Sequence, residues 1–143
     1  MNKLSITFSL PTTAKPSVIW QYYVDLNLRK LWETDLEDFY VNDGLISGAK
    51  GIFKLENMPE MEFTLSKVLE NKEFTEEFNM PDIGLLSFSH QIIEVEPNQY
   101  NLKSEISLKP VDELDDKLAY DFLKQISDDI IDKTFSLKNL VER

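Results

Sequence analysis

The C-terminal end of this chain carries the pattern that most constrains its fold. Apolar side chains recur there at the 3.6-residue period of a helix. They are Leu114, Leu118, Phe122, Ile126, Ile130, Leu137 and Val141. The pattern predicts one helix of about thirty residues, which would be about 45 Å long. A helix of that length cannot bury its apolar face against one short helix, so we expect it to lie across a β-sheet.

The preceding part of the chain has the pattern of a sheet. Residues 4–10 alternate apolar and polar side chains, which predicts a half-buried strand. A helix over 17–26 and a short helical turn at 28–32 are expected next. A run of strand patterns follows, at residues 39–41, 52–55, 63–69, 74–78, 85–95 and 100–108. Short connections such as the glycine-rich turn at 42–48 predict antiparallel neighbours.

Composition narrows the class of protein. The chain has 143 residues, of which 42% are hydrophobic and 29% charged, and we expect one α+β domain over residues 1–143. The chain contains no cysteine, which excludes disulfides, cysteine-ligated metals and cysteine nucleophiles. A net charge of −11 argues against nucleic acids and anionic membranes as partners.

Two further absences in the sequence bear on function. The chain has no Gly-rich phosphate-binding motif, no HExxH and no EF-hand loop, and one histidine cannot form a multi-histidine site. We therefore expect no cofactor and no metal. No uncharged stretch approaches the roughly 18 residues that cross a bilayer, and residues 1–7 alternate like a strand instead of forming a signal-peptide core. We therefore expect no membrane insertion and a cytoplasmic location.

The order of elements and several short motifs resemble the START-like (SRPBCC) superfamily, in particular its polyketide cyclase/dehydrase-type branch. The motifs cover nearly the whole chain. They are residues 6–11 (ITFSLP), 18–20 (VIW), 31–35 (LWETD), 43–51 (DGLISGAKG) and 88–90 (FSH). The resemblance implies the helix-grip fold, in which a curved antiparallel sheet wraps around a long C-terminal helix and short helices follow the first strand.

Polar residues on the predicted inner face of the sheet are the candidates for chemistry. His90 shares a face with Phe88 and Ile92, and a plausible register places Glu76 opposite it on one side and Ile106 on the other. An imidazole and a carboxylate in an apolar cavity could orient a ligand or act as acid and base. The alternative is a structural histidine, and a slip of one residue in register would separate the pair.

Other candidates are less specific. Lys67 either faces Glu76 or is turned to solvent by a bulge at Glu70, and the second interpretation is favoured. Trp32 is similar to a tryptophan commonly found near the cavity mouth in the superfamily, although a core position would also suit it. Further candidate cavity walls, each equally suited to a filled core, are Phe53, Phe63, Phe88, Phe122 and Ile126.

Three functions are compatible with these patterns. The leading hypothesis is binding of a hydrophobic small molecule, lipid- or polyketide-like as the resemblance implies, between the sheet and the C-terminal helix. The second is a cyclase or dehydratase that uses His90 and Glu76. The third is a protein-interaction module like the Hsp90-activator branch of the superfamily. The sequence leaves open whether the protein is a monomer or a homodimer.

Overall fold

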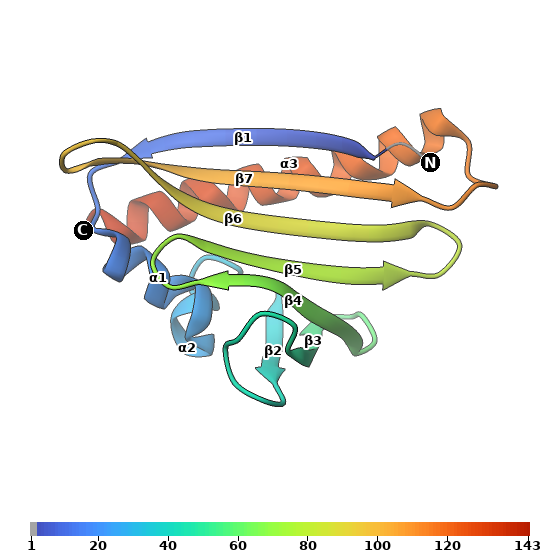
Figure 1. Ribbon diagram of the computed structural model, residues 1–143, viewed down its shortest axis with the longest axis horizontal. Coiled ribbons are helices and arrows are strands. Elements are labelled where there is room, and N and C mark those ends of the chain that lie inside the picture. The colour runs from blue at the N-terminus through green and yellow to red at the C-terminus, as the bar shows by residue number, and fades with distance from the viewer. Residues whose placement is uncertain (1–2) are drawn as a thin grey trace.

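The computed structural model describes residues 3–143, so Met1 and Asn2, which the sequence pattern includes in its N-terminal alternation, lie outside the described residues. Within this range the strands form a seven-stranded antiparallel sheet in the order β1-β7-β6-β5-β4-β3-β2 (Figure 1). The strands are β1 (Leu4–Thr12), β2 (Leu36–Val41), β3 (Lys50–Leu55), β4 (Met61–Leu69), β5 (Glu73–Met80), β6 (Gly84–Glu96) and β7 (Gln99–Pro110). The helices of the same range are α1 (Pro16–Val24), α2 (Leu26–Arg29) and α3 (Asp116–Val141).

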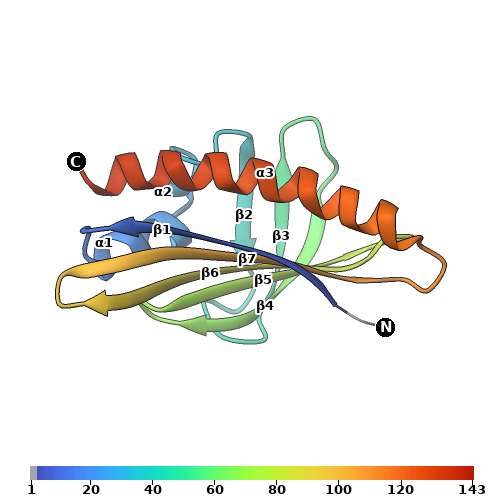
Figure 2. The ribbon, with the colours of Figure 1, turned by 90° about the horizontal axis from the view of Figure 1, so that it is seen from above.

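Helix α3 lies along one face of the curved sheet, and β2 and β3 rise beside it at a steep angle to β6 and β7 (Figure 2). The short helices α1 and α2 cover the sheet near the C-terminal end of α3. This arrangement confirms the predicted α+β class and helix-grip fold. The predicted strands and the turn before β3 are confirmed as well, with boundaries that differ by one to three residues.

The predicted helix boundaries were less accurate. Helix α1 ends at Val24 because Asp25 is extended, and the Asp25 carboxylate then accepts a hydrogen bond from the Leu28 backbone N–H to cap α2. Helix α3 has 26 residues and begins after Asp115, whose carboxylate accepts from the backbone N–H groups of Lys117 and Leu118. The helix is therefore about 39 Å long instead of about 45 Å.

The buried face of α3 is rotated relative to the predicted apolar stripe. Leu118, which the stripe includes, is 61% exposed. The buried positions are Ala119, Leu123, Ser127, Ile130, Thr134, Leu137 and Val141. Two of them are polar, so a search for apolar residues alone does not find the true contact line. The Thr134 hydroxyl donates to the Ile130 carbonyl and is thereby satisfied within the helix.

A cluster of aromatic side chains forms the core beneath β2–β5. Phe39 stacks on Phe63 with ring centroids 5.4 Å apart, and Phe63 stacks on Phe78 at 5.7 Å. Trp20 from α1 meets Phe74 edge to face at 6.1 Å. The contact between Trp20 and Phe74 places α1 against the sheet, and the charged residues that follow Asp25 come directly after α1.

Candidate functional site

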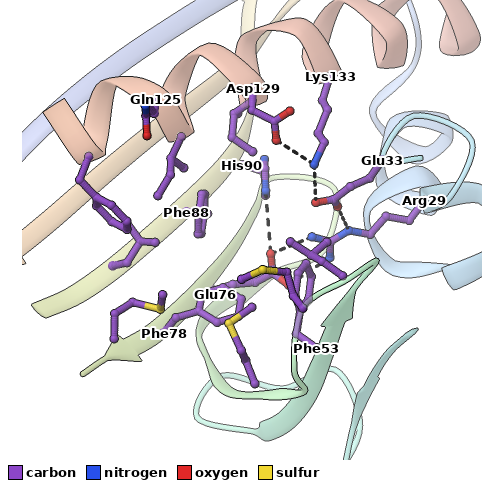
Figure 3. A pocket seen from close by; sticks show the side chains of 18 residues that line it. Arg29, Glu33, Phe53, Glu76, Phe78, Phe88, His90, Gln125, Asp129 and Lys133 are labelled. Atoms are coloured by element: carbon purple, nitrogen blue, oxygen red, sulfur yellow. Dashed lines mark hydrogen bonds and ion pairs between the residues drawn. The ribbon is translucent and has the colours of Figure 1, made fainter. Parts of the chain in front are cut away.

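A cavity of about 340 Å³ lies between α3 and the concave face of the sheet. Its walls come from β3, β4, β5 and β6 on the sheet side and from α3 on the other side (Figure 3). Most of the lining is apolar, and it includes four phenylalanines and three methionines: Phe53, Phe78, Phe88, Phe122, Met58, Met61 and Met80. Charged groups and His90 gather at one end, next to α2. The volume is within the range of small-molecule sites.

Six of the nine residues that the sequence identified as ligand-binding candidates line this cavity. They are Phe53, Glu76, Phe88, His90, Phe122 and Ile126. Glu76, Phe88 and His90 project from the predicted inner face of the sheet, because alternate strand residues share a face. Phe122 and Ile126 are four residues apart and share a side of α3. Whether any of them contacts a ligand stays a prediction.

The other three candidates lie behind the cavity wall. Phe63 and Ile106 are 3% and 1% exposed and belong to the core. Trp32 is buried too; its indole N–H donates to the Tyr22 carbonyl at 2.8 Å, and its ring packs edge to face on His90. Trp32 therefore supports a residue that lines the cavity but does not line it itself.

The register around His90 is shifted by two residues from the predicted one. His90 pairs with Ser104 on β7 and Phe74 on β5, whereas Glu76 and Ile106 are both opposite Phe88. A shift of two keeps every side chain on its face, so His90 and Glu76 still share the concave side. Their nearest atoms, His90 Nε2 and Glu76 Oε1, are 4.0 Å apart on a diagonal.

Lys67 takes no part in this site. Its side chain is 53% exposed and lies 3.5 Å from Glu73. The solvent-facing alternative is therefore the correct one, but the register shift lies between Leu65 and Lys67 and not at Glu70.

Arg29 is the centre of the charged end of the cavity, and sequence reasoning did not single it out. Its Nε donates to Glu33 at 2.7 Å, and its two terminal nitrogens form a two-pronged contact with Glu76 at 2.9 and 3.0 Å. The guanidinium also lies over the ring of Phe39, 4.8 Å from its centroid. With 2% exposure, Arg29 is fully committed to the protein interior.

Local structure explains how Arg29 reaches this position. After α2 the chain continues in tight turns, and the Glu33 N–H donates to the Arg29 carbonyl, so the two side chains are neighbours as in a helix. Glu76, which lies between Phe74 and Phe78 in the alternation of β5, requires a cation on the same face. A carboxylate on an apolar face is the one sequence signal that could have prompted a search for Arg29.

Lys133 on α3 extends the network across the charged end of the cavity. Its ammonium lies 2.9 Å from both Asp35 and Asp129 and 3.5 Å from Glu33. Burial lowers the pKa of Lys133, but Glu33, Asp35 and Asp129 outweigh that effect and raise it above its usual value. The lysine therefore stays charged and joins α3 to the turn after α2.

The two buried glutamates differ although both contact Arg29. Burial raises the pKa of Glu33, but Arg29 and Lys133 together outweigh it and hold the pKa below its usual value. Burial also raises the pKa of Glu76; Arg29 offsets this only in part, so its pKa stays above the usual value. The difference arises because Glu33 has two cations beside it and Glu76 has one.

His90 is the uncharged polar group of the cavity end. Burial, assisted by the positive charge of Arg29, lowers its pKa to about 4, so the imidazole is neutral near pH 7. Tyr23 and Trp32 pack on its ring with centroids 5.3 and 6.1 Å away. The Glu76 carboxylate lies 4.0 Å from His90 Nε2, beyond hydrogen-bonding distance, and both of its oxygens accept hydrogen bonds from Arg29.

Two features are absent from the described residues. Within residues 3–143, no three His, Asp or Glu side chains are grouped as metal ligands. Over the same residues, no helix combines the length and hydropathy needed to span a bilayer.

Comparison with known proteins identifies the fold. No protein-family model and no curated protein matches the sequence. Among solved structures, the Aha1 dimer from Colwellia psychrerythraea is 22% identical, with a TM-score of 0.63 over 97% of this chain and 96% of that one. Protein MLL2253 from Mesorhizobium loti is 10% identical, with a TM-score of 0.74 over 98% of both chains. Truncated norcoclaurine synthase from Thalictrum flavum is 12% identical, with a TM-score of 0.71 over 98% and 94%.

These likenesses extend over almost the full length of each chain. They confirm at the level of the fold that this protein has the START-like helix-grip architecture. At 10–22% identity they define the fold and leave the ligand and the activity to be argued from the cavity.

Proposed function

We propose that the protein binds a hydrophobic small molecule in the cavity between α3 and the sheet. The observation that carries the proposal is a cavity of about 340 Å³ whose walls are mostly phenylalanine, methionine and aliphatic side chains. Transfer of apolar ligand surface from water into such a site contributes about 25 cal/mol per Å². Methionine side chains at Met58, Met61 and Met80 adapt to ligand shape because they are unbranched and flexible.

Filling the cavity from α3 tests this proposal. Ile126 lines the cavity, and Ile131 on the same helix does not. The probe is N-phenyl-1-naphthylamine, an uncharged apolar dye whose fluorescence rises in an apolar site. We expect the dye to bind the wild type, and Ile126→Trp to weaken binding at least about tenfold. The matched variant Ile131→Trp should bind the dye like the wild type.

Circular dichroism and thermal unfolding establish that both variants are folded. A wild-type protein that does not bind the dye, or an Ile126→Trp variant that binds it unchanged, would overturn the proposal. Native mass spectrometry of freshly purified protein provides a second readout, in which a bound apolar molecule would support it.

A catalytic role is the second candidate, and the diagonal between His90 and Glu76 is what favours it. A neutral imidazole 4.0 Å from a carboxylate with a raised pKa is suited to proton transfer at a ligand bound against both. Under this alternative the protein is a cyclase or dehydratase of polyketide-like compounds. His90→Phe should then abolish turnover while dye binding is retained, and retained turnover would reject the assignment.

The interaction-module hypothesis rests on the fold shared with the Aha1 dimer alone. A stable protein complex in a pulldown, without copurifying small molecule, would favour it over ligand binding. Sedimentation would show whether the chain is a monomer or a homodimer.

A further inference from the structure

The charges at the inner end of the cavity are compensated by one another. Arg29 and Lys133 carry two positive charges, and Glu33 and Glu76 carry two negative charges. All three guanidinium nitrogens of Arg29 donate to these carboxylates. Lys133 is held by Glu33, Asp35 and Asp129. In the described chain, both cations that line the cavity therefore have their carboxylate partners already.

A charged ligand head group would thus enter this end without a free partner. A carboxylate would lose its hydration and find both cations engaged, and an ammonium would find both glutamates engaged. An unpaired charge is the most unfavourable group to place in an apolar site, because the lost hydration is not replaced. Asp129 and Asp35 carry the remaining negative charge, but they are 59% and 43% exposed and are screened by solvent.

His90 provides a neutral hydrogen-bonding side chain at this end of the cavity. Its ring is 5% exposed, faces the cavity and is fixed by Tyr23 and Trp32 behind it. A neutral imidazole has one N–H donor and one acceptor nitrogen, and the 4.0 Å between His90 Nε2 and Glu76 Oε1 is too long for a hydrogen bond. A ligand hydroxyl that bonds to the imidazole therefore adds a hydrogen bond in a mostly apolar site.

We propose that the cavity selects an uncharged amphiphile, with its apolar body along the phenylalanine and methionine walls and a hydroxyl head hydrogen-bonded to His90. This proposal rests on the proposed binding function and adds the class of ligand to it. It states that fatty acids and alkylamines of the same chain length are rejected.

Three ligands that share the same alkyl chain length but differ in head group test this selectivity: 1-decanol, decanoate and decylammonium at pH 7.5. Displacement of N-phenyl-1-naphthylamine from the wild-type protein measures the affinity of each ligand. We expect decanol to bind at least about tenfold more tightly than either ion, which is about 1.4 kcal/mol. Decylammonium distinguishes the cavity's own preference from the attraction of the whole protein, because a net charge of −11 would attract any cation.

Two variants locate the effect. His90→Phe removes both nitrogens and should weaken decanol binding about fivefold to tenfold while dye binding persists. The matched control is Gln21→Leu, which removes an exposed polar side chain of α1 that does not line the cavity and should leave the preference unchanged.

The outcomes are distinct for the two proposals. Absence of dye binding to the wild type contradicts the binding function itself. Dye binding together with equal or tighter binding of decanoate or decylammonium contradicts the ligand class. If the protein binds the dye but His90→Phe does not change the affinity for decanol, the proposed role of His90 is wrong. The comparison of the three ligands uses the wild type alone and is independent of how the variants fold.

Discussion

The two ends of the cavity differ in chemistry. Buried ion pairs at one end stabilise the fold, and apolar side chains at the other end are available to a ligand. The inner end, around Arg29, is fully buried and held by ion pairs between α2, the turn after it and β5. The mouth, around Met58, Phe122 and Gln125, is partly exposed and carries no buried ion pair among the residues that the structure describes. We therefore expect substitutions of the ion-paired residues at the inner end to change the free energy of unfolding, and substitutions at the mouth to change ligand affinity with little effect on stability.

Arg29→Met should give the largest effect. The variant leaves Glu76 and Glu33 buried beside each other without their shared cation, which is expected to destabilise the fold by about 3–5 kcal/mol. Urea unfolding followed by circular dichroism measures this change. Lys30→Met, at the exposed neighbouring position, is the control and should change stability by less than about 0.5 kcal/mol. A loss below about 1 kcal/mol for Arg29→Met would show that the inner end is not held by its ion pairs.

Acid should destabilise the inner end through His90. The pKa of His90 is about 4 in the folded protein and 6.5 in its unperturbed state, so the unfolded chain binds a proton in this range and the folded one does not. The stability that His90 contributes is therefore present above pH 6.5 and is lost as the pH falls toward 4. The loss is about 3 kcal/mol.

Comparison of wild type and His90→Phe isolates this contribution from the other groups that titrate nearby. The lowered pKa of Glu33 adds a further loss at lower pH, whereas the raised pKa of Glu76 favours the folded state there. Both remain in the variant, so the difference between the two stability curves reports His90. Parallel curves between pH 6.5 and 4 would contradict the lowered pKa.

The smallest effect on stability is expected at the mouth. Met58 and Leu31 are both large, exposed apolar residues, but only Met58 lines the cavity. Met58→Ala should change the free energy of unfolding by less than about 0.5 kcal/mol and weaken dye binding twofold to fivefold. Leu31→Ala should leave dye binding unchanged. Equal affinities for the two variants would remove Met58 from the site.

The two ends also differ in how well the sequence predicted them. Phe53, Phe88, Phe122 and Ile126 were named as candidate cavity walls, equally suited to a filled core, from apolar patterns that depend only on spacing along one element, and they line the cavity. Arg29 was missed because its role depends on a partner 47 residues away in the chain. Trp32, Phe63 and Ile106 were assigned to the cavity but lie behind it, since a pattern shows the face of a residue and not its depth.

The sequence by itself determined the order of elements, the faces of the strands and the long C-terminal helix, because hydrophobic periodicity is a local property that each element carries alone. Only the tertiary structure decided the register around His90, the rotation of α3 away from Leu118 and the assembly of Arg29, Glu33, Glu76 and Lys133. These depend on how elements distant in the chain pack, and the energy of a buried charge is set by the partners that this packing brings to it.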